Sequence, residues 1–300
     1  MAGLKTAGAW LISLSLTLAC QTSLARDKLP VWELENTDNR VLILGSVHFL
    51  RASDYPLPDG VFAAYELADN LVMEVDMDDL DPLEAQAVMT RLGVSEDGRD
   101  LREILGEQDY EIVAKRAKEL GLPIELFQHI EPWLAGLTIS QMQMLALGFD
   151  PSWGIETQMM QRAIQDGKPI DGLETLDEQL GFLDALDEDT QAMFLMQSLD
   201  DATRVQQELE SMVTAWRSGD TQDMAELFLQ EMLDEAPALY DALLVQRNRS
   251  WLSTIEDLTT RNENYLIVVG TLHLVGDDSV ISMLDESGIS ARQLSSGDFD

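Results

Sequence analysis

The chain has 300 residues, with 55 acidic and 19 basic side chains, so its formal net charge at pH 7 is −36. A negative field of this size repels nucleic acid and anionic lipid, and it argues against nucleic acid as a partner. The length and the ordinary apolar content favour one large globular domain over two.

The first 25 residues have the features of a secretory signal peptide. Lys5 provides a small positive n-region, the segment 7–19 is almost wholly apolar, and Ser23-Leu24-Ala25 fits a small-x-small cleavage site. The apolar segment is too short for a comfortable membrane span. We therefore expect an exported, periplasmic protein that does not span the membrane, with residues 26–300 as a single domain. The alternative is lipoprotein processing, in which Cys20 becomes a lipid anchor.

The N-terminal third alternates predicted strands and helices, which is typical of an α/β fold. Short aliphatic runs predict strands over 30–34, 40–45, 70–76 and 123–127. Apolar residues at helical spacing predict helices over 57–69, 82–92 and 109–120.

From about residue 132 to residue 260 the strand pattern nearly disappears. Helical periodicity predicts helices over 133–147, 155–165, 177–186, 190–218, 221–232 and 236–258, interrupted by a short strand and turn over 168–174. The strand pattern then resumes over 265–270 and 289–294, with a helix over 277–286. We expect a central sheet with a large helical section inserted between its two parts.

Two short segments are near copies of each other. Leu42–Leu50 matches Ile267–Val275 in chemical type at every position: an aliphatic run, Gly, a hydroxyl residue, an aliphatic residue and then His48 or His273. The runs are typical of buried strands, and the glycine marks where the chain leaves the sheet. Functional side chains of α/β proteins gather at the carboxyl ends of strands, so we expect His48 and His273 to form one composite site.

These residue types point to a divalent metal. Imidazole binds zinc, manganese, cobalt and iron, and it is also the usual general base near neutral pH. Two histidines need a carboxylate to hold an ion well. Glu74, at the end of the strand 70–76, is the best candidate and Glu174 is the next. The alternatives are histidines that are only hydrogen-bonded and a Glu74 that only forms a salt bridge.

Three further residues need an interpretation. Arg247 and Asn248 lie in an apolar helical stretch, where Arg247 could clamp a substrate carboxylate, support a ligating Glu, or form an ordinary ion pair. We interpret His129, at a predicted junction, as structural. No P-loop, dinucleotide fingerprint, G-x-S-x-G, H-E-x-x-H or C-x-x-C pattern occurs, which disfavours nucleotide and serine- or cysteine-nucleophile chemistry.

Taken together, these segments resemble the TraB/GumN family, which is related to the Tiki proteases. The resemblance runs in order from about residue 31 to the end of the chain. It is carried by Gly45-Ser46-Val47-His48, Glu74 within 71–76, Gly148-Phe149-Asp150, Gly172-Leu173-Glu174-Thr175 with Gln179, Arg247-Asn248, and Gly270-Thr271-Leu272-His273.

The resemblance implies an α/β core formed by two related halves, shared with the erythromycin-esterase and ChaN-like proteins. It also implies a metal-dependent peptidase site that uses manganese or cobalt. On that likeness His48 and His273 are metal ligands, and Glu74 and Glu174 act as ligand or general base.

We therefore expect an exported metal-dependent hydrolase that acts on a peptide or protein substrate. The ion is manganese or cobalt, with zinc as a further option, held by His48, His273 and Glu74; the catalytic residues are Glu74, Glu174 and Arg247. The alternatives are a non-catalytic periplasmic protein that binds a peptide or haem, and metal-free hydrolysis with His48 as general base.

Overall fold

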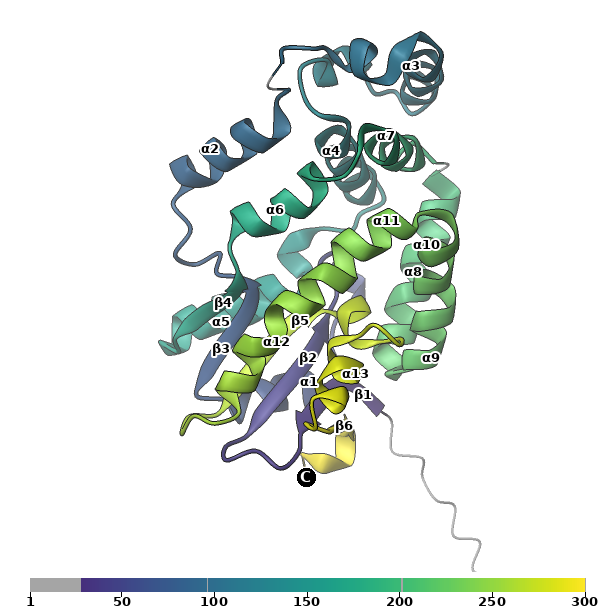
Figure 1. Ribbon diagram of the computed structural model, residues 1–300. Coiled ribbons are helices and arrows are strands. Elements are labelled where there is room, and N and C mark those ends of the chain that lie inside the picture. Colours follow the sequence, from purple (N-terminus) through teal and green to yellow (C-terminus); the bar gives the residue numbers. More distant parts are fainter. Residues whose placement is uncertain (1–27, 96, 201, 300) are drawn as a thin grey trace, which may run out of the picture.

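The structure is a computed structural model that describes residues 28–95, 97–200 and 202–299; the predicted signal peptide and Cys20 lie outside these ranges. Its centre is a mixed six-stranded sheet with the strand order β4-β3-β5-β2-β1-β6 (Figure 1). The strands β2 to β5 are parallel to one another, and β1 pairs antiparallel with both of its neighbours. The strand bounds are β1 Lys28–Leu34, β2 Val41–Ser46, β3 Asn70–Val75, β4 Ile170–Glu174, β5 Tyr265–Gly270 and β6 Ala291–Ser295.

Helices make up most of the remaining chain. The α-helices are α1 Asp59–Glu66, α2 Pro82–Gly93, α3 Leu101–Glu119, α4 Pro132–Ala146, α5 Ile155–Asp166, α6 Leu176–Asp184, α7 Glu188–Gln197, α8 Ala202–Ser218, α9 Thr221–Met224, α10 Gln230–Glu235, α11 Pro237–Tyr240, α12 Gln246–Leu258 and α13 Val280–Glu286. Two π-helical turns, η4 Ala225–Leu229 and η5 Asp241–Val245, connect α9 to α10 and α11 to α12. The short 3-10 helices are η1 Ala52–Asp54, η2 Ile124–Phe127, η3 Pro151–Trp153, η6 Thr271–Leu274 and η7 Ser296–Asp298. The expectation of an α/β fold with a large helical section is confirmed.

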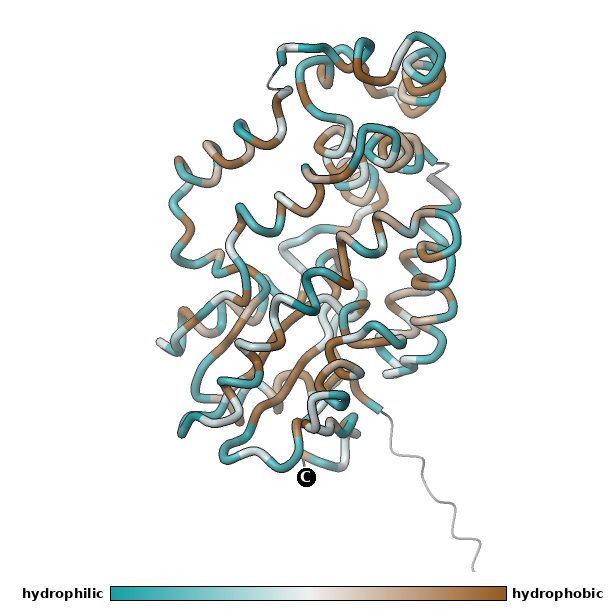
Figure 2. The backbone as a smooth tube through the Cα atoms, viewed as in Figure 1, coloured by the Kyte–Doolittle hydropathy of each residue, from teal (hydrophilic) through white to brown (hydrophobic). Residues whose placement is uncertain are grey.

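The sheet is covered on both faces, as an inner parallel sheet requires. Residues of β2 and β5 alternate between two apolar clusters: Leu42 and Leu266 belong to the one under α1, α5 and α8, whereas Ile43 and Ile267 belong to the one under α12 and α13. The central strands are accordingly the most hydrophobic part of the chain trace, and hydrophilic residues gather in the outer loops and helices (Figure 2).

Helices α2, α3, α4, α6 and α7 form a layer beyond the carboxyl ends of the strands, at the top of Figure 1. Helices α3, α4 and α7 share one apolar cluster, and α2, α4, α6 and α11 share a second. The helical part therefore begins at α2, well before the predicted start at about residue 132, and it is interrupted by β4.

Two predicted elements are wrong. The segment 123–127 is the 3-10 helix η2 and not a strand, since Ile124 and Phe127, three residues apart, pack together into the cluster of α3 and α7. The predicted helix 190–218 is two helices that break around Ser198, whose carbonyl accepts a hydrogen bond from Gln143 Nε2 at 2.5 Å instead of continuing a helix. The helix predicted over 109–120 begins earlier, at Leu101, where Asp100 caps it. Other boundaries move by a few residues; the helix predicted over 277–286 begins at Val280, where Ser279 caps it.

Candidate functional site

The two repeated motifs end side by side, because β2 and β5 are neighbouring parallel strands. The pairing is offset by one residue from the sequence match: Gly45 pairs with Val269, and Ser46 pairs with Gly270. Since successive side chains of a strand point to opposite faces, matching residues of the two motifs face opposite sides of the sheet. Leu42 and its counterpart Ile267 accordingly lie in different apolar clusters.

His273 is held as a neutral imidazole with a fixed tautomer. It lies in η6 with its side chain 5% exposed, and its Nδ1 is 2.6 Å from Asn248 Oδ1. Asn248 Nδ2 donates to the carbonyl of Asp278 at 2.7 Å, so its Oδ1 is the atom that faces the ring. Nδ1–H of His273 therefore donates, and Nε2 is left as an acceptor. Burial lowers the pKa of His273 to about 3.

His48 has the opposite character. Its side chain is 58% exposed, and its Nδ1 lies 2.8 Å from Glu156 Oε1. The negative charge of Glu156 raises the pKa of His48 to about 9, against the opposing effect of desolvation. Glu156 lies in the first turn of α5 and also accepts the Ser46 hydroxyl, while its buried Oε2 has no hydrogen-bond partner among the residues that the structure describes.

Glu74 is the buried carboxylate between the two histidines and Arg247. Its Oε2 accepts from Arg247 Nη2 at 2.6 Å, and its Oε1 accepts from the backbone N–H of Gly270 at 2.6 Å and lies 3.9 Å from His273 Nε2. Burial acts to raise its pKa, but the positive charge of Arg247, the neighbouring histidine rings and the Gly270 hydrogen bond lower it to about 2. Glu74 is therefore ionised at neutral pH.

Glu174 and Arg247 form a bidentate ion pair beside it. Arg247 Nε and Nη2 donate to Glu174 Oε1 at 3.0 and 2.6 Å, and Trp251 Nε1 donates to Oε2 at 3.0 Å. Gln179 Nε2 bridges the two carboxylates, at 3.0 Å from Glu174 and 3.2 Å from Glu74. Burial raises the pKa of Glu174 above its ordinary value, and the N–H groups of Arg247 and Trp251, which favour the ionised form, oppose this rise.

The space left by Gly270 joins these groups. A Cβ atom at this position would lie 3.3 Å from Glu74 Oε1, 3.4 Å from His273 Cδ2 and 3.7 Å from His48 Nε2. Two imidazoles and one carboxylate thus converge around one point, and both rings are oriented through Nδ1 by a second residue. This donor set suits a divalent cation.

Arg247 sets a condition on that fit. Its Nη1 lies 3.2 Å from His273 Nε2, so an ion at this nitrogen would have to displace the guanidinium contact. Among the described residues, no group of three or more His, Cys, Asp or Glu has the spacing of a formed metal site.

The match to a protein-family model covers residues 30–293, almost the whole described chain, and its family is TraB/PrgY/gumN. The chain belongs to the TraB/PrgY/gumN family. It is 26% identical over 242 residues to the uncharacterized protein YbaP of Escherichia coli strain K12, covering 81% of this chain and 86% of the relative. The uncharacterized protein YbaP of Shigella flexneri matches to the same extent. No solved structure matches.

In this family member, two hydrogen bonds hold the His48 motif in place. Thr271 Oγ1, from the second motif, donates to the carbonyl of Ser46 at 2.8 Å, and Trp216 Nε1, from α8, donates to the carbonyl of Gly45 at 2.7 Å. A Cβ at Gly45 would lie 2.8 Å from Thr271 Oγ1, so glycine is needed for this close approach. The helical section thus fixes the end of β2 directly.

The structure brings together His48, His273, Glu74, Glu174 and Arg247, all of which the sequence singled out. His129 lies outside this cluster, in an exposed turn after η2. The sequence analysis missed Glu156 and Trp251. The sequence signal for Glu156 was weak: it follows the loop 148–154, which belongs to the family resemblance. In the structure this loop packs against His48, and a side chain at Gly154 would collide with the carbonyl of His48.

No helix in the described ranges, 28–95, 97–200 and 202–299, is both long and apolar enough to cross a membrane.

Proposed function

We propose that this protein is an exported metal-dependent hydrolase that cleaves peptide bonds. The observation that carries the proposal is the convergence of His48 Nε2, Glu74 Oε1 and the His273 ring around the space beside Gly270. Export rests on the sequence features of residues 1–25, and the peptide substrate rests on the resemblance to the Tiki proteases.

The residues that would hold the ion are His48, His273 and Glu74. A bound manganese, cobalt or zinc ion supplies a water of lowered pKa and polarises the scissile carbonyl. His273 is prepared for this role because its Nδ1–H is given to Asn248 and its Nε2 lone pair is left free of a proton. His48 first has to lose a proton, since Glu156 keeps it charged near neutral pH.

The other polar residues have distinct tasks. Glu174, Gln179 and Arg247 orient Glu74, and Arg247 Nη1, which lies 3.2 Å from His273 Nε2, would donate to a substrate oxygen. The oxygens of Glu174 are already engaged by N–H groups, and Glu74 is a weak base with its pKa of about 2. Glu156 Oε2, buried and without a partner in the described chain, is the carboxylate oxygen best suited to receive a proton from water.

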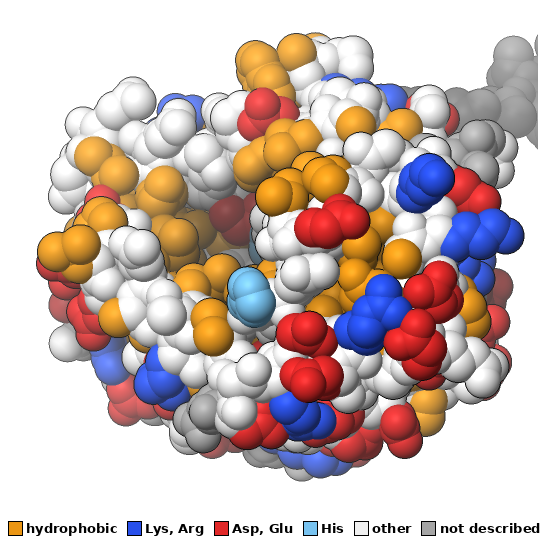
Figure 3. Space-filling model, turned by 90° about the horizontal axis from the view of Figure 1, so that it is seen from above, with side chains coloured by type: hydrophobic (Ala, Val, Ile, Leu, Met, Phe, Trp, Pro, Cys, Tyr) orange, Lys and Arg blue, Asp and Glu red, His pale blue; other side chains and the backbone are white. Residues whose placement is uncertain are grey.

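The exposure of His48 provides the route for a substrate. The surface seen from the helical end is hollowed between the helices, with hydrophobic side chains around the hollow (Figure 3). Such an open entrance suits an extended peptide better than a small molecule, which usually binds in a closed cavity.

Elemental analysis of untagged protein, residues 26–300, tests the proposal beside the His48→Ala/His273→Ala double variant. Each protein is reloaded with manganese, cobalt or zinc and then screened against a peptide library. We expect near-stoichiometric metal and cleavage in the wild type and neither in the variant. Equal metal content in the two proteins, or turnover that persists in the variant, would contradict the assignment.

Metal-free hydrolysis is the second candidate, and one contact favours it: Arg247 already places a cation at His273 Nε2. In that case the charged His48 acts as a proton donor. Turnover that resists chelators but is lost in the double variant would select it.

A further inference from the structure

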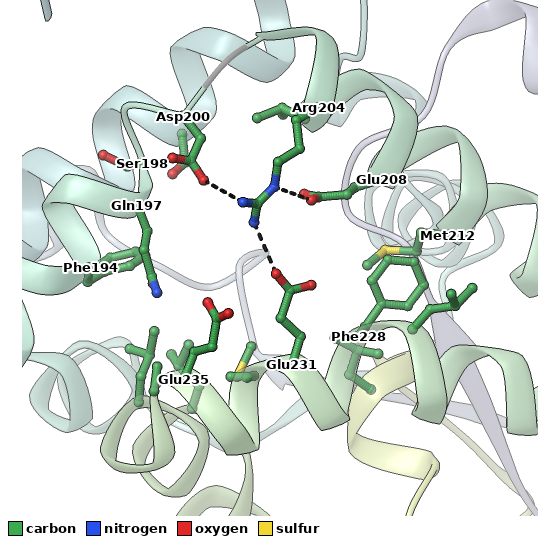
Figure 4. A pocket seen from close by; sticks show the side chains of 18 residues that line it. Phe194, Gln197, Ser198, Asp200, Arg204, Glu208, Met212, Phe228, Glu231 and Glu235 are labelled. Carbon is green, nitrogen blue, oxygen red and sulfur yellow. Dashed lines mark hydrogen bonds and ion pairs between the residues drawn. The ribbon is translucent and has the colours of Figure 1, made fainter. Parts of the chain in front are cut away.

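A groove between the helices lies next to the candidate site. It is about 320 Å³ and runs between α7 and α8 on one side and η4, α10 and α11 on the other (Figure 4). Its apolar wall includes Phe194, Met212 and Phe228. Leu272 and Leu243 also line it: the first precedes His273, and the carbonyl of the second accepts from Arg247 Nη1 at 3.2 Å. The groove therefore adjoins both the second motif and the arginine of the site.

The groove has an excess of negative charge. Four acidic residues line it, namely Asp200, Glu208, Glu231 and Glu235, against the single cation Arg204. Arg204 is already held by three of them, at 3.4 Å from Asp200, 2.7 Å from Glu208 and 3.1 Å from Glu231 (Figure 4). Such a groove attracts a cationic ligand and repels an anionic one.

A buried acceptor at the inner end of the groove indicates a ligand with an N–H donor. Gln143 is 7% exposed and lines a contiguous pocket of about 200 Å³ that shares Met212 and Phe228 with the groove. Its Nε2 donates to the carbonyl of Ser198, which fixes the orientation of the amide, and its Oε1 has no hydrogen-bond partner among the described residues. An unmet buried acceptor is costly, and a donor from a ligand would relieve that cost.

Both π-helical turns contribute to this wall, through Phe228 of η4 and Leu243 of η5. π-Helical turns are rare and occur frequently at functional sites.

We propose that the groove binds a peptide segment that carries both basic and apolar side chains. The apolar side chain packs between Phe194, Met212 and Phe228, the basic side chain faces the acidic rim, and an N–H group of the segment donates to Gln143 Oε1. This inference rests on the proposed function only where it makes the segment a part of the substrate; binding itself does not depend on catalysis.

The test is the affinity of three short fluorescent peptides of equal length, built from Lys and Leu, from Glu and Leu, and from Lys and Ser. Because the whole chain is strongly acidic, each variant has a control with the same net charge. Glu235→Gln is compared with Glu286→Gln on α13, and Arg204→Gln with Arg91→Gln on α2. All four positions are exposed, so the fold is preserved.

We expect only the Lys/Leu peptide to bind the wild type at physiological salt. Compared with the wild type, Glu235→Gln should bind it several-fold more weakly and Arg204→Gln several-fold more tightly. The two control variants should bind it as the wild type does. Gln143→Met, which keeps the side-chain length, should weaken binding about tenfold. Equal shifts in variants and controls would overturn the inference, since they would report only the overall field of the protein.

The position of the bound peptide is checked with NMR spectra of ¹³C-methyl-labelled methionines. Met212 and Met232 line the groove and Met144 lines the inner pocket, whereas Met89 and Met283 line neither of them. Binding that moves the signals of Met89 or Met283 but not those of Met212 and Met144 would contradict the proposal. The same titration on the His48→Ala/His273→Ala variant should give unchanged affinity, which separates failure of the groove from failure of the hydrolase.

Discussion

His48 and His273 stand in nearly identical sequence motifs at the ends of neighbouring strands, yet they have opposite electrostatics. His48 is 58% exposed, and its pKa is raised to about 9; His273 is 5% exposed, and its pKa is lowered to about 3. The difference comes from what each Nδ1 meets, a carboxylate in one case and a side-chain amide in the other, and from burial. A repeated motif therefore positions two imidazoles, and residues elsewhere in the chain decide the charge of each.

The largest effect on stability is expected at Arg247, which contacts His273, Glu74 and Glu174 and so supports the buried side of this contrast. Arg247→Ala leaves two buried carboxylates without their cation, so we expect a loss of about 3–5 kcal/mol in the free energy of unfolding. Urea denaturation measures it. Arg261→Ala, which removes an exposed i,i+4 pair with Asp257, is the control and should cost under about 1 kcal/mol. Similar losses in both variants would show that the buried cluster is not a special source of stability.

The two histidines should differ in their contribution to stability although both belong to the proposed metal site. His273→Ala leaves Asn248 Oδ1 buried without its donor, so we expect a cost of about 1–3 kcal/mol. His48→Ala removes an exposed partner of Glu156 and should cost less than about 1 kcal/mol. Thermal and urea unfolding of both variants without metal give the comparison. A larger loss for His48→Ala would reverse the assignment of the buried and open positions.

Glu156→Gln should reduce the difference between the pKa values of the two imidazoles. With the carboxylate replaced, we expect the pKa of His48 to fall by at least about one unit, which NMR titration of the imidazole carbons measures. An unfolded histidine titrates near 6.5. The stabilisation from the raised pKa of His48 is therefore complete below about pH 6.5 and is lost as the pH rises through about 9. The wild type should lose stability over that range, and Glu156→Gln should lose less.

Metal binding gives a second readout of the same difference. Near pH 7 the wild type should release a proton when an ion binds, because His48 must be deprotonated, and Glu156→Gln should release less. Calorimetry in two buffers of different ionisation enthalpy measures the released protons. Equal release by the two proteins would mean that Glu156 does not control His48.

The smallest effect is expected at the hydrogen bond between the two motifs. Thr271→Val keeps the shape of the side chain but removes the donor to the Ser46 carbonyl, at a cost of about 1 kcal/mol. The titration of His48 should be unchanged, since Glu156 is not touched. Ser46→Ala is the counterpart: it removes the hydroxyl that Glu156 accepts and should shift the His48 titration. A shift in the Thr271→Val spectrum instead would mean that backbone position, not Glu156, sets the charge.

The central strands could be predicted from the sequence because parallel strands buried on both faces are continuous aliphatic runs. The same criterion fails for short runs. The segment 123–127 has the composition of a strand, but its two buried residues are three apart and its neighbours are helices. The break near Ser198 was also hidden, because the apolar spacing continues across it and the compensating hydrogen bond comes from Gln143, far away in the chain.

The site, like the fold, could be predicted from the sequence only in part. Strand ends of a parallel sheet meet at one edge, so His48, Glu74 and His273 could be placed together. The roles of their partner residues could not be predicted. Glu156 reaches His48 only because the loop at Gly154 packs closely against it. Arg247 reaches two carboxylates only because α12 packs on the sheet.

The one-residue offset between β2 and β5 has a consequence for symmetry. Two parallel strands whose matching residues face opposite sides and are offset by one residue are related by a local twofold rotation about an axis along the strands, combined with a shift of one residue along that axis. The histidines follow the strand ends on either side of this axis. Even an object as small as an ion would meet two different imidazoles there, one open and one buried. The two ends of a longer ligand would meet different walls: the open approach at His48 and the acidic, apolar groove beyond Leu272. These unlike surroundings of two similar strand ends would fix the direction in which a peptide lies across the proposed site.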